Sequence, residues 1–153
     1  MKKYCNYQNE NAKRYLNHVR TLKKIANEQE LTLKEFMLNP QKLTAVISDM
    51  PKGGGQSDLS DVLVRYEELK ETIIPELNET LKKYHAIVGQ ILHMENKSFS
   101  HILYAYYVNG KSWKAISDDV DYSWRHLMRI KELALEEFER EYKDEILLSI
   151  RTQ

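Results

Sequence analysis

Two arginines spaced one helical turn apart are the residues of this chain best suited to a specific chemistry. Arg125 and Arg129 belong to the segment 123–134, whose apolar residues recur at helical spacing: Leu127, Ile130 and Ala134. At about 100° per residue, both arginines fall nearly opposite that apolar face. The fork of a guanidinium group matches the O6 and N7 acceptors that guanine presents in the DNA major groove. The spacing therefore predicts a helix that reads bases.

Neighbouring residues extend this predicted DNA surface. His126 and Met128 flank the arginines, and Trp124 lies closer to the apolar edge of the helix. Phosphate contacts on either side are expected from side chains that precede the helix, start it or follow the arginines: Lys111, Ser112, Lys114, Ser123 and Lys131. Three acids shortly before this helix oppose this interpretation, because they would repel phosphate if they faced it: Asp118, Asp119 and Asp121.

The predicted surface needs two short helices to position it. Ser112 stands where an N-cap belongs, before apolar residues at helical spacing: Trp113, Ile116 and Val120. The pattern breaks at 121–122, and Ser123 provides a second N-cap. Helices joined so closely must cross steeply, which is the helix-turn-helix arrangement whose second helix can enter a major groove.

The rest of the chain predicts a helical stalk, so the expected fold class is all-α. Apolar residues over 8–38 alternate three- and four-residue steps, which is typical of a coiled-coil seam, and 1–49 is expected to be an N-terminal helical segment with a short helix after Pro40. Pro and glycines make 50–57 a connector. A long central helix is expected over 58–96, kinked or broken at Pro75. The helix-turn-helix domain then occupies 98–153.

An antiparallel hairpin of the two long helices is the economical way to bury their seams, because such helices are unstable alone in water. Four apolar residues are expected on the outside of this hairpin: Leu16, Ile25, Leu63 and Ile87. They favour a homodimer or higher homo-oligomer. A closed monomeric hairpin is the alternative.

Composition narrows the class of protein. The chain has 153 residues and a formal net charge of zero, with a basic first thirty residues and an acidic stretch over 132–145. A single cysteine, Cys5, leaves no disulfide framework and favours a reducing compartment. No secretory signal or membrane span is apparent in the sequence, so a cytoplasmic protein with no membrane partner is expected.

No catalytic or metal-binding pattern emerges, and we expect neither an enzyme nor a cofactor. The tripeptide Gly110-Lys111-Ser112 resembles the end of a phosphate-binding loop, but Ala105 replaces the required glycine and the preceding residues are helical in pattern. The five histidines have no ligand spacing with Cys5. Ser123 and His126 lack a third catalytic member.

The segment 110–134 resembles region 4 of bacterial sigma factors. The resemblance rests on a glycine, two serines and apolar residues at matching spacing: Gly110, Ser112, Trp113, Ile116, Ser123, Leu127 and Ala134. It implies that the residues after the second serine touch bases, namely Trp124, Arg125, His126, Met128 and Arg129. The chain departs from the sigma-factor pattern in the charge that follows these positions. Sigma factors are usually more basic there, whereas this chain carries four acids: Glu132, Glu136, Glu137 and Glu139.

Over most of its length the chain resembles phage regulators of the ArpU/RinA type. The shared features are the segment 12–16, the connector beginning at Ser48-Asp49-Met50-Pro51, a long helix starting near Asp58, and the sigma-region-4-like end. The resemblance implies a phage or prophage transcriptional regulator in the cytoplasm of a bacterial host, activating late genes on double-stranded DNA, with host RNA polymerase as a further partner. Two alternatives stay open: a small terminase subunit for DNA packaging, and a phage inhibitor that uses the helical head to bind a protein.

Overall fold

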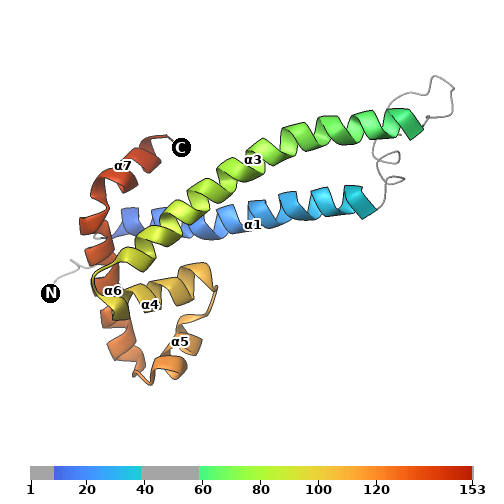
Figure 1. Ribbon diagram of the computed structural model, residues 1–153. Helices are drawn as coiled ribbons and strands as arrows, with labels where there is room; N and C mark the ends of the chain where they lie inside the picture. The colour runs from blue at the N-terminus through green and yellow to red at the C-terminus, as the bar shows by residue number, and fades with distance from the viewer. Residues whose placement is uncertain (1–8, 39–58, 153) are drawn as a thin grey trace. The chain divides into compact units, whose positions relative to one another are not determined.

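The computed structural model describes residues 9–38 and 59–152 (Figure 1). Every regular element in these residues is helical and none is a strand, so the predicted all-α class is confirmed. The elements are α1 (Glu10–Leu38), α3 (Leu59–His93), α4 (Lys97–Leu103), the π-helix η1 (Tyr104–Val108), α5 (Trp113–Val120), α6 (Trp124–Glu141) and α7 (Lys143–Arg151). The short helix expected after Pro40, the connector 50–57 and Cys5 lie outside the described residues.

The chain divides into two compact units. The first unit comprises Met1–Leu22 and Lys83–Gln153, and the second comprises Lys23–Lys82. Both long helices contribute to each unit. None of the described helices is long and apolar enough to cross a membrane.

The first unit is built around a core that α1, α3, α4, η1, α6 and α7 share. Its largest fully buried side chains include Leu16, Ile91, Met94, Leu103 and Phe138. Within this unit α1 and α3 run antiparallel, because Tyr15 donates a hydrogen bond to Gln90 Oε1 at 2.9 Å while His18, further along α1, lies beside Lys83, earlier in α3. This pairing agrees with the predicted hairpin.

The apolar seam of α1 matches the predicted spacing. Five of its positions are buried, from the start of the helix into the second unit: Ala12, Tyr15, Val19, Leu22 and Ala26. The same spacing continues with the polar Gln29 and with Leu33 and Phe36, and these three residues are half-buried. Burial therefore weakens along α1 away from the first unit.

Two residues expected on the outside of the hairpin are in fact in the core. Leu16 is fully buried and Ile87 is 4% exposed, and both belong to the main core of the first unit. The prediction was wrong for them because it considered only the two long helices, whereas several shorter elements cover these helices as well. Ile25 and Leu63 are exposed, as predicted.

Pro75 does not break the central helix. Of the two outcomes expected there, a kink or a break, the break is wrong. Helix α3 continues from Leu59 to His93 with Pro75 inside it. Proline removes one backbone donor and crowds the preceding turn, which a helix tolerates where the freed carbonyl can bind water. Pro75 and the residue one turn before it, Glu71, are both exposed.

The helical segment that precedes Gly110 changes type along its length. After α4 the chain widens into η1, where the Asn109 amide donates to the Tyr104 carbonyl at 3.1 Å, five residues back. Gly110 then reverses the chain at φ +71°, a conformation that favours glycine. Helix α7, which the sequence reasoning did not separate from α6, packs on α6 and buries Ile146.

Candidate nucleic-acid interface

The predicted caps define the start of α5 and of α6. Ser112 Oγ accepts a hydrogen bond from the Ala115 amide at 3.1 Å, and Ser123 Oγ accepts one from the His126 amide at 3.3 Å. Each serine therefore satisfies an amide that its helix cannot satisfy itself. Both serines act as acceptors in these bonds, so their hydroxyl protons stay free to donate to a phosphate.

The turn between α5 and α6 has its own fixed geometry. Asp121 ends α5 in the left-handed conformation at φ 53°, which a short polar side chain adopts more readily than most. The Ser117 hydroxyl donates to the Tyr122 carbonyl at 2.6 Å, and the Tyr122 ring packs edge-on against His126, with ring centroids 4.7 Å apart. The direction in which α6 leaves the turn is therefore set by several local contacts.

A second, smaller core holds α4, η1, α5 and α6 together. Its buried members are Ile102, Ala105, Ile116 and Leu127. Leu127 and Ala134 are fully buried, and Ile130 is half-buried, so the predicted inward face of α6 is correct. The opposite face of α6 is thereby directed to solvent.

The two arginines occupy that solvent face. Arg125 and Arg129 are exposed, and neither guanidinium has an ion-pair or hydrogen-bond partner among residues 9–38 and 59–152. His126 is exposed beside them, and the Trp124 side chain is 55% exposed at the first turn. The start of α6 thus presents donors and an aromatic ring that internal contacts leave available.

Met128 differs from its neighbours. Its side chain is half-buried and packs against the smaller core. Among the residues expected to read bases, Met128 therefore has a packing role in this structure.

The predicted phosphate-binding lysines have different surroundings. Lys114 is exposed and forms no ion pair within the described part of the chain. Lys111 is exposed but ion-paired with Asp119. Lys131 is mostly covered, with its ammonium 5.3 Å from the ring centroid of Trp113 and 3.7 Å from a carboxylate oxygen of Glu132. Lys114 is accordingly the lysine that is most available to an external anion.

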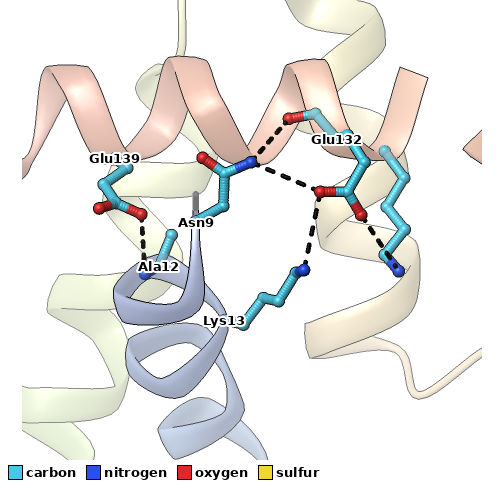
Figure 2. Close-up of polar contacts among 6 residues, drawn as sticks. Asn9, Ala12, Lys13, Glu132 and Glu139 are labelled. Carbon is cyan, nitrogen blue, oxygen red and sulfur yellow. Dashed lines mark hydrogen bonds and ion pairs between the residues drawn. The ribbon is translucent and has the colours of Figure 1, made fainter. Parts of the chain in front are cut away.

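Several acidic residues that follow Arg125 and Arg129 in α6 bind other helices. These contacts were not predicted from the sequence. Figure 2 shows two of these acids, Glu132 and Glu139, facing the start of α1. Glu139 accepts a hydrogen bond from the buried Ala12 amide at 3.3 Å. Glu132 accepts from the Asn9 side chain at 3.5 Å and lies 3.6 Å from the Lys13 ammonium.

Another of these acids, Glu137, accepts a hydrogen bond from the Asn96 amide at 3.3 Å, just before α4. Three of the four acids singled out in the sequence, Glu132, Glu137 and Glu139, therefore bind other parts of the protein. No local pattern could have revealed these contacts, because Asn9 and Glu132 are 123 positions apart.

A cavity of about 470 Å³ lies elsewhere in the first unit, between α1, α3 and α7. Its lining includes Tyr15, His18, Lys83, Glu145 and Ser149. Burial, and secondarily the charge of Lys83, lower the pKa of His18 from its ordinary value of 6.5. Among the described residues, no group of three or more histidines, cysteines and acids is arranged to hold a metal ion.

Comparisons with known proteins identify no relative. No family model matches the chain, and neither a curated protein nor a solved structure shows significant similarity to it.

Proposed function

We propose that this protein binds double-stranded DNA through the exposed face of α6 and acts as a transcriptional regulator. The observation that carries the proposal is the pair of exposed guanidinium groups, Arg125 and Arg129, without internal partners at the start of a helix whose opposite face is buried. In a helix-turn-helix protein, the first turns of the second helix contact base edges. Here α5, the turn and α6 would present Arg125 and Arg129 to guanines.

Lys114 would contact a phosphate and fix the register, since it is exposed near the start of α5. His126 and Trp124 would touch the sugar-phosphate backbone or a thymine methyl group. The resemblance to ArpU/RinA-type proteins supports a phage or prophage regulator of late genes, working in the cytoplasm of a bacterial host.

The direct test is selection of binding sites from random duplex DNA by the full-length protein, followed by affinity measurements on selected and scrambled duplexes over a series of salt concentrations. We expect Arg125→Ala to cost about 1–3 kcal/mol on the selected site and to relax the preference at one base pair. Arg129→Ala should act at a neighbouring position. Arg140→Ala is the matched control, because Arg140 is exposed on the same helix but lies at its far end.

The outcomes separate the proposals. If Arg125→Ala bound the selected and the scrambled duplex with the same affinities as wild type, Arg125 would not be a base-reading residue. No wild-type affinity for any duplex at low salt would remove DNA binding altogether.

We further propose that the protein acts as a homodimer. Exposed apolar residues on the second unit support self-association, notably Ile25, Leu31 and Leu63. A dimer predicts paired half-sites in the selected DNA. The mass in solution tests this: a dimer favours the regulator, a ring of many subunits favours a small terminase subunit, and a monomer at micromolar concentration contradicts the proposal.

A second candidate function is binding to another protein through the same face. The 55% exposure of Trp124 beside arginines favours it, because tryptophan and arginine are enriched among the residues that dominate protein interfaces. Capture of a host protein that Trp124→Ala abolishes, by a chain with no affinity for DNA, would establish this function instead.

A further inference from the structure

Arg20, a residue of α1, lies against the π-helix η1 that precedes the helix pair α5 and α6. Its Nη2 donates a hydrogen bond to the Tyr106 carbonyl at 2.7 Å. Its guanidinium carbon lies 4.2 Å from the centroid of the Tyr106 ring and 6.0 Å from that of Tyr107. One side chain therefore makes a charge-assisted hydrogen bond and a cation–π contact with the same residue.

The end of η1 explains why a guanidinium is favourable at this point. The carbonyls of Tyr104 and Ala105 accept hydrogen bonds from the amides of Asn109 and Lys111, at 3.1 Å and 3.0 Å. The next carbonyl, that of Tyr106, receives the Arg20 hydrogen bond instead. The last carbonyls of a helix lack internal partners and carry partial negative charge, so a cation there is stabilising.

Tyr106 transmits this contact to α5. Its ring stacks on that of Trp113, with centroids 4.1 Å apart and planes inclined by 16°. Trp113 is the first residue of α5, directly after the N-cap Ser112. A shift of Tyr106 therefore moves, or loses, one of the contacts at the start of α5, which the Ser112 cap also holds.

Lys131 completes the series on α6. Its ammonium lies 5.3 Å from the Trp113 ring centroid, two residues after Arg129. We name the series Arg20, Tyr106, Trp113 and Lys131 the cation–aromatic stack. It joins α1, η1, α5 and α6 next to the part of α6 that carries the exposed arginines.

We propose that Arg20 is a positioning residue for DNA recognition, acting through Tyr106 and Trp113 on the placement of α5 and of the first turns of α6. The inference rests on the proposed function, and it assigns to the long helix α1 a part in sequence specificity. Base-reading contacts require exact placement of α6, whereas non-specific contacts to phosphates tolerate small shifts. Loss of the stack should therefore reduce specific binding more than non-specific binding.

The geometry requires arginine and not merely a positive charge. A planar guanidinium can donate to the Tyr106 carbonyl while its face lies over the Tyr106 ring, and the ammonium group of lysine cannot do both in the same way. Arg20→Lys therefore keeps the charge and removes the positioning contact. This distinguishes a positioning role from a direct phosphate contact, which lysine would preserve.

The test uses the full-length protein, the selected duplex and a scrambled duplex. We expect Arg20→Lys and Arg20→Ala to lower the ratio of specific to non-specific affinity by at least about fivefold, the lower end of what one base contact contributes to discrimination. Non-specific affinity and its salt dependence should stay at wild-type values. Arg14→Ala is the matched control, because Arg14 is exposed on the same helix and has no partner in the described part of the chain.

Two further measurements guard against misinterpretation. Trp113→Leu breaks the stack without removing Arg20, and it should lower the affinity ratio similarly. The chain has two tryptophans, Trp113 and Trp124. In a Trp124→Phe variant, tryptophan fluorescence therefore comes from Trp113 alone and reports on the stack directly. Arg20→Lys should then make Trp113 more accessible to a soluble quencher, with or without DNA.

Each contrary result has a distinct meaning. Equal weakening of specific and non-specific binding by Arg20→Ala, with a smaller salt slope and rescue by Arg20→Lys, would make Arg20 a phosphate contact. An unchanged affinity ratio with a lower unfolding temperature would make its role purely structural. Either result overturns the positioning role while leaving DNA binding intact, whereas a wild-type protein that binds no duplex overturns both proposals.

Discussion

The Lys111 ammonium lies 2.6 Å from a carboxylate oxygen of Asp119, and both side chains remain about half exposed, at 46% and 50%. This ion pair joins the residue before the N-cap of α5 to the acidic end of that helix. It also brings together a predicted phosphate contact and one of the acids that argue against DNA binding. The pair therefore lowers the local repulsion of phosphate and, at the same time, occupies a lysine that would attract it.

The first prediction concerns this ion pair. Asp119→Asn should free Lys111 and raise non-specific DNA affinity at low salt. The slope of log affinity against log salt should steepen by no more than the contribution of about one phosphate contact. Unfolding free energy should change by no more than about 1 kcal/mol, because exposed ion pairs contribute little. The measurement is DNA affinity across a salt series, with calorimetry for stability.

Asp118→Asn is the control. Asp118 is also exposed, and this substitution removes the same charge without freeing a lysine. If both variants changed affinity equally, the general charge of the helix would explain the effect, and the ion pair would have no special role.

The sequence predicted the helix pair well because the signals there are local. Ser112 and Ser123 each cap the helix that starts next to them, and the spacing of Leu127 and Ala134 defines the inward face of α6. Such features depend on residues within one or two turns. The exposed positions of Arg125 and Arg129 followed from the same spacing.

Contacts between distant segments could not be predicted in this way. Arg20 and Tyr106 are 86 positions apart, and Ala12 and Glu139 are 127 positions apart. Nothing in the local pattern of α1 indicates which other helices cover it. The prediction that Leu16 lies on the outside of the hairpin is wrong for this reason, since Leu16 is buried in the core. The transition to a π-helix at Tyr104 likewise has no local sequence signal that we can identify.

The second prediction follows from the corrected position of Leu16. Leu16→Ala should lower the unfolding free energy by about 2–5 kcal/mol, the range for a buried leucine that leaves a cavity. Ile25→Ala, further along α1 at a 38% exposed position, should cost much less. Urea unfolding measures both, and similar losses would contradict the assignment of Leu16 to the core.

The third prediction tests the binding of α1 to α6. Ala12 belongs to the first turn of α1, whose amides lack internal partners, and Glu139 supplies the acceptor from another helix. Glu139→Ala leaves a buried amide without its partner and should cost about 1–3 kcal/mol of unfolding free energy.

The matched control for this prediction is Glu136→Ala. Glu136 is exposed on the same helix and has no hydrogen-bond or ion-pair partner within residues 9–38 and 59–152, so its removal should change stability by less than about 0.5 kcal/mol. Equal effects of the two substitutions would show that helix α6 responds to its overall charge and not to the Ala12 contact.

The fourth prediction concerns pH. His18 is half-buried beside Lys83 in the cavity that Glu145 also lines, and this burial, together with the charge of Lys83, lowers its folded-state pKa below the ordinary 6.5. The unfolded chain therefore binds this proton more tightly, so the contribution of neutral His18 is complete above pH 6.5 and is lost as pH falls through the folded-state pKa. His18→Gln should flatten the decline in unfolding temperature on acidification, with His101→Gln as the control for removal of an exposed imidazole. A steeper decline in His18→Gln would reverse the sign of the proposed effect.

The fifth prediction separates the lysines on the proposed DNA surface. Lys114 is exposed and unpaired in the described part of the chain, so Lys114→Ala should weaken binding to all sequences alike and reduce the salt slope by about one. Lys143→Ala removes an exposed lysine at the start of α7 and should leave the slope at its wild-type value.

Lys131 provides the contrasting case, because its ammonium already contacts Trp113 and Glu132. Lys131→Ala should lower the unfolding temperature and the specific affinity while keeping the salt slope of wild type. If instead Lys131→Ala reduced the slope and Lys114→Ala did not, the phosphate backbone would follow α6 and not the start of α5. The orientation of the helix pair on DNA would then have to be reversed, although Arg125 and Arg129 would still face the duplex.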